Sequence, residues 1–165
     1  YVSVVWGCPY EGAVKIGTTR RVAKALFDIG CFEVSLGDTI GVATPKTVEG
    51  ILTQLSAFPK EKLALHFHDT RGLAVANVLR AVQMGFRSFD SSAGGLGGCP
   101  YAPGAAGNVA TEELVLLAEG LGFKTGLDAL GIAKASQVII DFLGRPPRSK
   151  AYQALLTTQN IFPPM

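Results

Sequence analysis

The sequence predicts an α/β fold in which parallel strands alternate with helices. Short apolar runs rich in β-branched and aromatic residues recur along the 165-residue chain, and a longer segment of helical periodicity follows each of them. Four such units of roughly 25–30 residues are typical of parallel βαβ architecture. A doubly wound sheet fits this pattern, and so does half of a (β/α)8 barrel, because a complete barrel needs ~250 residues.

The boundaries follow from turn and capping residues. Strands are predicted at residues 2–6, 32–36, 63–67 and 86–90. Helices are predicted from Thr18 or Thr19 to about 29, and at about 45–57, 73–84, 110–119 and 127–143. Thr44 followed by Pro45 is a capping residue with proline at the first helical position, and Arg145-Pro-Pro147 ends the last helix.

Composition excludes several classes of protein. The chain is 48% hydrophobic and 17% charged with a net charge of +2, and its lysines and arginines are scattered, which argues against nucleic-acid binding. No apolar run approaches the ~20 residues of a membrane span. The three cysteines fit no disulfide or zinc pattern and indicate thiols in a reducing compartment. The chain opens inside a predicted strand, without an initiator methionine or a charged leader, so we expect it to be a piece of a longer protein.

Polar residues gather just after the predicted strands, where α/β folds place their sites. They include Asp38, His66, His68 and Asp69, followed by a long glycine-rich stretch. His66 and His68 are two apart on a strand, so both imidazoles face the same side and can chelate one metal ion. The alternative is one core and one surface histidine, each bonded to a backbone carbonyl. Asp69 is equally suited to capping the next helix or to orienting a ligand.

The glycine-rich stretch runs from Gly94 to Asn108 and contains six glycines, which allow close backbone approach to a ligand and loop closure. Cys99 within it is a candidate acid–base group or nucleophile, and an inert thiol in a turn is the alternative. The Lys and Ser/Thr of a phosphate-binding P-loop are absent. Cys8 follows a strand in a shorter loop and is interpreted as supporting or structural, whereas Cys31 is predicted to lie in the core.

Five blocks carry a resemblance that no single motif provides. The stretch Ser91–Ala102 contains Gly-Leu-Gly-Gly-Cys-Pro-Tyr, and it is accompanied by GCPYEG at 7–12, SLGDTIG at 35–41, HFHDTRG at 66–72 and GNVATE at 107–112. In sequence and in order these blocks resemble the 3-hydroxy-3-methylglutaryl-CoA (HMG-CoA) lyase family, whose signature carries the active-site cysteine. The resemblance weakens after about residue 126.

The resemblance implies the C-terminal half of a (β/α)8 TIM barrel, about four βα units corresponding to strands five to eight, with a helical extension over 127–165. It implies a divalent cation, Mg2+ or Mn2+, bound by His66, His68 and Asn108. It further implies a catalytic Cys99 and a catalytic Asp38 near metal and substrate. Supporting roles fall to Asp69, Glu112, Gly97 and Gly98.

The implied reaction cleaves HMG-CoA to acetyl-CoA and acetoacetate. The family's Arg-Asp pair on the first strand has no counterpart in this chain, so we expect the isolated chain to be inactive. Arg71 and Ala93-Gly94 also depart from the family's usual residues, which leaves the sub-branch open. Alternatives are a Claisen-type synthase of the isopropylmalate or homocitrate kind, a non-catalytic fragment, and a structural zinc site of both histidines with Cys99. Cys99 favours the lyase, because the synthases carry Gly-Glu-Arg there.

The resemblance also sets expectations for partners and location. We expect a small CoA thioester as substrate, no nucleic-acid or membrane partner, and a homodimer as one state of the full-length protein. The expected location is the cytoplasm in a bacterium or the mitochondrial matrix in a eukaryote.

Overall fold

The computed structural model describes residues 1–98 and 107–157. By backbone contacts these residues form two compact units. The sheet unit contains Tyr1–Asp90 with Gly98 and Gly107, and the helical unit contains Ser91–Gly97 and residues 108–157. No helix among the described residues is both long and apolar enough to cross a membrane.

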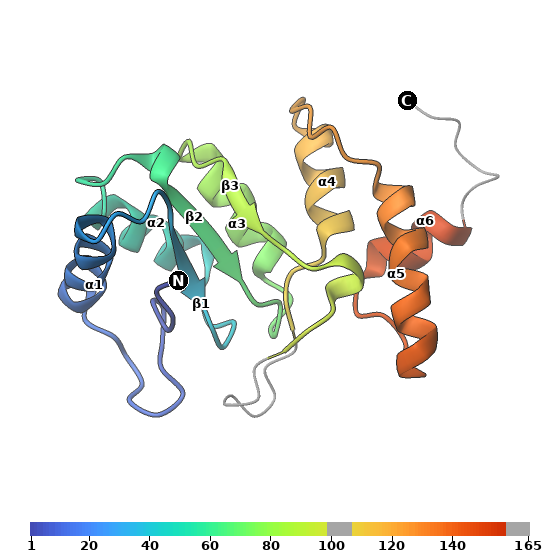
Figure 1. Cartoon of the computed structure of the whole chain (residues 1–165), viewed down its shortest axis with the longest axis horizontal. Coiled ribbons are helices and arrows are strands. Elements are labelled where there is room, and N and C mark those ends of the chain that lie inside the picture. The colour runs from blue at the N-terminus through green and yellow to red at the C-terminus, as the bar shows by residue number, and fades with distance from the viewer. Residues whose placement is uncertain (99–106, 158–165) are drawn as a thin grey trace. The chain divides into compact units, whose positions relative to one another are not determined.

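The sheet unit is built on three parallel strands in the order β1-β2-β3, with α2 and α3 packed together on one face (Figure 1). The strands are β1 (Val34–Asp38), β2 (Leu63–Phe67) and β3 (Ser88–Asp90). The helices are α1 (Ile16–Asp28), α2 (Pro45–Gln54), α3 (Ala74–Gln83) and the short η1 (Lys60–Lys62). Every residue of β1 is buried, and so is every residue of β2 except His66, as expected for parallel strands.

The strand register places the functional candidates at one end of the sheet. Gly37 lies opposite His66, and His66 lies opposite Asp90, so three neighbouring strands end together there. Local signals position the following helices: Thr44 accepts a hydrogen bond from the Thr47 backbone, and Thr47 accepts one from Thr44 in return. This reciprocal cap with Pro45 begins α2 where the sequence predicts it.

The first predicted strand is the main local error. Of residues 2–6 only Val2 forms a β-bridge, a parallel one with Leu36, and the Val5 amide donates one further hydrogen bond to the Gly37 carbonyl at 3.0 Å. Val4 has a φ of +57°, a left-handed conformation that β-branched residues rarely adopt, and it breaks the ladder. Thr39 stabilises this turn by accepting a hydrogen bond from the Val4 amide at 2.8 Å. The other strand predictions are confirmed within two residues, and β2 is confirmed at both ends.

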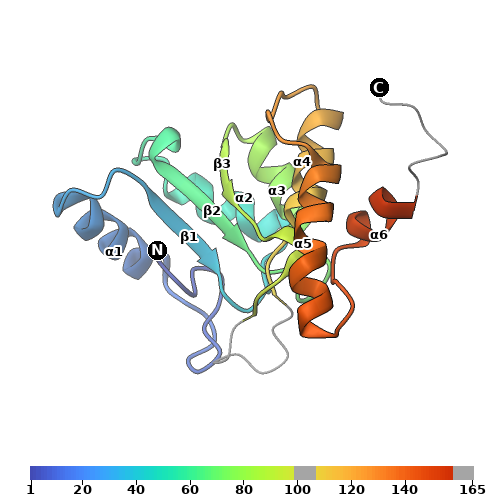
Figure 2. The same cartoon turned by 45° about the vertical axis from the view of Figure 1, so that its right-hand side comes forward.

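The helical unit consists of the short η2 (Ala93–Gly95) and three helices, α4 (Thr111–Gly120), α5 (Ala129–Leu143) and α6 (Lys150–Thr157), which Figure 2 shows from a second side. Its small core joins Ala133 and Ile140 of α5 to Tyr152 of α6. The carboxylate of Asp128 caps α5, and Gly144 ends it in the left-handed conformation. α6 falls within the helical extension expected over 127–165, although no separate helix was predicted there, and Ser149 accepts a hydrogen bond from the Tyr152 amide at 3.0 Å near its beginning.

Candidate active site

The two histidines lie next to each other at the carboxyl end of β2. Their ring centroids are 4.9 Å apart and the rings meet edge to face. This is the placement that strand alternation predicts for residues two apart. His66 Nδ1 pairs with the carboxylate of Asp90 on the neighbouring strand. An ionised carboxylate can only accept, so Nδ1 is the donor in this pair and Nε2 is the ring nitrogen that is not used by Asp90, an arrangement common in metal-binding histidines.

Asp90 is the partner that sequence reasoning missed. Ser35 donates to its second carboxylate oxygen at 3.0 Å. Burial would raise the pKa of Asp90, but the hydrogen bond and charge of His66, together with the Ser35 and Tyr1 hydroxyls, outweigh burial and hold this pKa below its ordinary value. The carboxylate is therefore ionised and fixes the imidazole. The sequence signal that could have identified Asp90 is an acidic residue at the end of the predicted strand that follows the His-x-His strand.

Asp38 is fully buried at the end of β1. Its two oxygens accept from the backbone amides of Val42 and Ala43, at 2.9 Å each. Burial raises the pKa of Asp38, against the lowering effect of those amides and of the charges on Arg71 and His66. Asp38 thus holds the loop after β1 in shape, and its predicted catalytic role stays a prediction.

The loops after β1 and β2 approach each other closely. Gly41 has a φ of +61°, and a Cβ there would lie 2.7 Å from Thr70 Oγ1 and 2.9 Å from the His68 carbonyl oxygen, so only glycine fits. Asp69 accepts from the Ala74 amide at 2.9 Å at the start of α3. This contact ties Asp69 to the first residue of α3, and its predicted supporting role stays a prediction.

Asn108 lies in the helical unit beside the glycine stretch. Its amide nitrogen donates to the Leu96 carbonyl at 3.0 Å, which leaves Oδ1 as the atom that can bind a cation. Gly97 has a φ of +100°, and a Cβ there would lie 2.7 Å from Asn108 Nδ2. Gly98 is exposed. Cys99, which follows it, lies outside the described residues.

Glu112 on α4 is fully buried and anchors the beginning of the glycine stretch. Both carboxylate oxygens accept from the Gly94 amide, at 2.8 and 3.0 Å, and Ser136 of α5 donates to one of them at 3.3 Å. Glu112 therefore contacts the beginning of the glycine stretch, and its implied supporting role stays a prediction.

Two of the three thiols, Cys8 and Cys31, lie in the described part of the chain. Cys8 is half-buried and closes its loop through an antiparallel bridge to Gly12. The core prediction for Cys31 is wrong, because this thiol is only half-buried. Among the described residues no three His, Cys, Asp or Glu side chains gather as a metal site. The zinc alternative involves Cys99 and so lies outside them.

Comparison with known proteins shows the family to which this chain belongs. A family model described as HMGL-like matches residues 2–139, and the chain belongs to that family. It is 53% identical over 156 residues to the mitochondrial hydroxymethylglutaryl-CoA lyase of Arabidopsis thaliana, covering 94% of this chain and 33% of that protein.

Two solved structures extend the likeness to the fold. The HMG-CoA lyase of Bacillus subtilis is 49% identical with a TM-score of 0.91, covering 95% of this chain and 53% of its own. An HMG-CoA lyase from Acinetobacter baumannii, in complex with coenzyme A and 3-methylmalate, is 38% identical with a TM-score of 0.88, covering 99% and 53%. The predicted fold class, half of a TIM barrel, is confirmed, and the chain spans about half the length of these two structures.

Proposed function

We propose that the full-length protein cleaves the C2–C3 bond of HMG-CoA to give acetyl-CoA and acetoacetate. The observation that carries the proposal is the pair of adjacent imidazoles, one of them oriented by Asp90, in a chain that is 53% identical to a hydroxymethylglutaryl-CoA lyase. The family and its relatives' names support the reaction class.

The proposal includes a divalent cation, Mg2+ or Mn2+, held by His66, His68 and Asn108. The fit of these residues rests on two contacts: Asp90 occupies His66 Nδ1, and the Leu96 carbonyl occupies the Asn108 amide nitrogen. Each contact leaves the ligating atom, an imidazole nitrogen or an amide oxygen, for the ion. When bound, the cation supplies Lewis-acid polarisation of substrate oxygens.

The chain's own residues move and hold protons in this scheme. A general base accepts the proton of the tertiary alcohol as the alcohol oxygen becomes the keto oxygen of acetoacetate, and the C2–C3 electron pair passes to the thioester as an enolate. We assign Cys99 the delivery of a proton to the enolate carbon, which yields acetyl-CoA. Glu112 holds the Gly94 amide at the start of the stretch that carries Cys99. Asp38 holds the loop beside the histidine pair.

The proposal extends to the chain in isolation. The family's Arg-Asp pair has no counterpart among its 165 residues, so we expect this polypeptide alone to be inactive. We place residues 1–165 in one barrel domain with 127–165 as a helical extension. Assaying the 165-residue chain beside the full-length protein tests this, and equal turnover of the two would contradict it.

The decisive experiment measures acetyl-CoA release from HMG-CoA by the full-length protein with and without Mg2+ or Mn2+. Changing His66 or His68 to alanine should abolish metal stimulation. Cys99→Ser should lower turnover by about 100-fold or more while leaving metal affinity within threefold. Cys31→Ser is the matched control and should keep its activity. Undiminished metal stimulation in both histidine variants would overturn the ligand assignment.

A further inference from the structure

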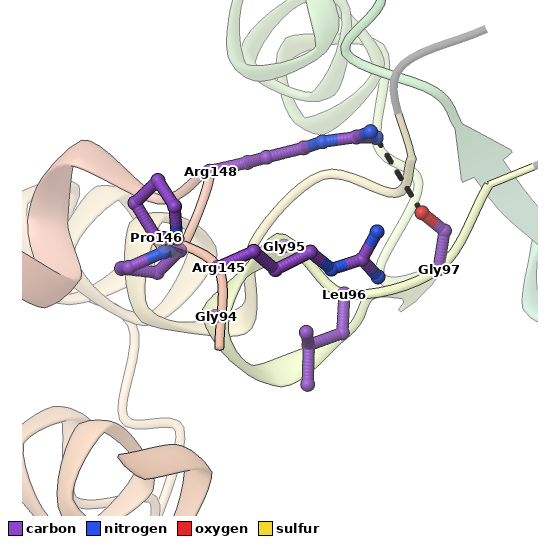
Figure 3. A pocket seen from close by; sticks show the side chains of 8 residues that line it. Gly94, Gly95, Leu96, Gly97, Arg145, Pro146 and Arg148 are labelled. Atoms are coloured by element: carbon purple, nitrogen blue, oxygen red, sulfur yellow. Dashed lines mark hydrogen bonds between the residues drawn. The ribbon is translucent and has the colours of Figure 1, made fainter. Parts of the chain in front are cut away.

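Side chains from elsewhere in the fold hold the loops that carry the candidate residues. In the helical unit, Figure 3 shows Arg148 reaching the carbonyl of Gly97, a contact of 3.5 Å that is long and exposed. In the sheet unit, the loop after β1 is held by shorter contacts, and one of these is fully buried. The buried contact comes from Asn77 of α3, a residue to which the proposed reaction gives no role.

The backbone of Ala43 is held on both sides. Its amide donates to Asp38 Oδ2 at 2.9 Å, and its carbonyl accepts from Asn77 Nδ2 at 3.0 Å. Ala43 and Asn77 are each only 1% exposed, so water does not replace either contact. Ala43 therefore cannot turn away from Asp38 without losing a buried hydrogen bond to Asn77.

Asn77 keeps this contact at a cost to stability. Its Oδ1 is buried and has no hydrogen-bond partner among the described residues. The side-chain amide cannot turn over, because Oδ1 would then face the Ala43 carbonyl and both atoms are acceptors. A buried acceptor without a partner destabilises the folded state, whereas a leucine of similar size would carry no such atom. The donor contact to Ala43 is thus what an asparagine supplies at this position.

The loop after β1 is tied in this way to the βα unit that carries the histidine pair. Asn77 lies on α3, the helix that follows β2, and α3 packs against α2. Arg71, between β2 and α3, adds two contacts to the same loop, since its Nη1 donates to the carbonyls of Ile40 and Gly41 at 3.0 and 2.9 Å. The unit that supplies both imidazoles therefore also fixes the loop that binds the Asp38 carboxylate.

We propose that Asn77 is a positioning residue, which holds the Asp38 carboxylate in place through the backbone of Ala43. This role rests on the function proposed above, in which Asp38 takes part in the cleavage of HMG-CoA. Among the described residues, the side chain of Asn77 makes its one hydrogen bond to Ala43. Its effect on turnover must therefore pass through the loop and Asp38.

A double-mutant cycle in the full-length protein tests this route. Asn77→Leu should lower kcat for HMG-CoA cleavage about tenfold, because the carboxylate is no longer held in its productive place. In an Asp38→Asn background the same substitution should have no further effect on kcat, since two residues that act through one contact are not additive. An equal loss of kcat in both backgrounds would overturn the positioning role.

A second measurement does not depend on the reaction. Amide hydrogen exchange of Val42 and Ala43, followed by NMR relative to the amides of β2, should be about tenfold faster in Asn77→Leu and in Asn77→Ala, because the loop opens without its buried brace. Val78→Ala is the matched control, since Val78 is also buried on α3 but has no polar side-chain atom. It should leave kcat and both relative exchange rates within about twofold.

The two readouts separate this proposal from the proposed function. Unchanged exchange of both amides in the Asn77 variants would overturn the positioning role even if the unaltered protein cleaves HMG-CoA. Faster exchange in a full-length protein that does not cleave HMG-CoA would support the hold of Asn77 on the loop and refute the proposed reaction instead.

Discussion

Replacing Gly97 with alanine should weaken metal binding without substituting any proposed ligand, because the new Cβ displaces the side chain of Asn108. The new Cβ would lie 2.7 Å from Asn108 Nδ2, closer than side chains tolerate, so the amide must leave the Leu96 carbonyl. The φ of +100° adds backbone strain of about 1–2 kcal/mol, which should appear as a lower free energy of unfolding in urea. Loss of the oriented amide should raise the Kd for Mn2+ about tenfold or more, measured by calorimetry.

Gly122→Ala is the matched control. Gly122 also has a positive φ, +84°, but a Cβ there meets nothing within 4 Å. It should cost a similar unfolding free energy of about 1–2 kcal/mol and leave Mn2+ affinity unchanged. The reasoning fails if both variants lose metal affinity equally, or if Gly97→Ala binds Mn2+ as tightly as the unaltered protein.

Three other changes test separate contacts. Asp90→Asn should lower Mn2+ affinity about 10- to 100-fold, because His66 loses the carboxylate that orients its ring, and an unchanged Kd in calorimetry would refute this. Burial, then the charges of Asp141 and Glu112, raise the pKa of Tyr152 above its ordinary 10.0. The folded form thus keeps its proton while the unfolded chain ionises, so unfolding free energy should fall as pH rises past 10, and Tyr152→Phe should flatten that fall. Glu112→Ala should destabilise the protein by about 2–4 kcal/mol in urea by orphaning the buried amide it accepts from, and a loss below about 0.5 kcal/mol would contradict this.

Local signals decided which elements could be predicted. Thr44 with Pro45 begins α2 at the predicted residue, and the apolar run Leu63–Phe67 gives both ends of β2. Periodicity could not predict the interruption of the regular ladder at Val4, because its left-handed turn involves a hydrogen bond to Thr39, which is 35 residues away in the chain. Distant partners override local propensity in this way wherever the backbone is strained.

The same distinction between local signals and distant partners separates the features of the candidate site that could be predicted from those that could not. The side-by-side histidines followed from strand alternation, a rule that acts over two residues. The contact between His66 and Asp90 could not be predicted in this way, because the two residues become neighbours only through the register of β2 and β3. Likewise, the contact of Glu112 with Gly94 joins residues 18 apart across a helix start. Such contacts depend on tertiary packing, which periodicity does not encode.

The central claim is that His66 and His68 bind one divalent ion, and electron spin-echo spectroscopy of Mn2+-loaded full-length protein tests it most directly. Two imidazole nitrogens should modulate the Mn2+ echo, and each of His66→Ala and His68→Ala should remove one of the two couplings. An echo without nitrogen modulation, or one that neither substitution changes, would contradict the account.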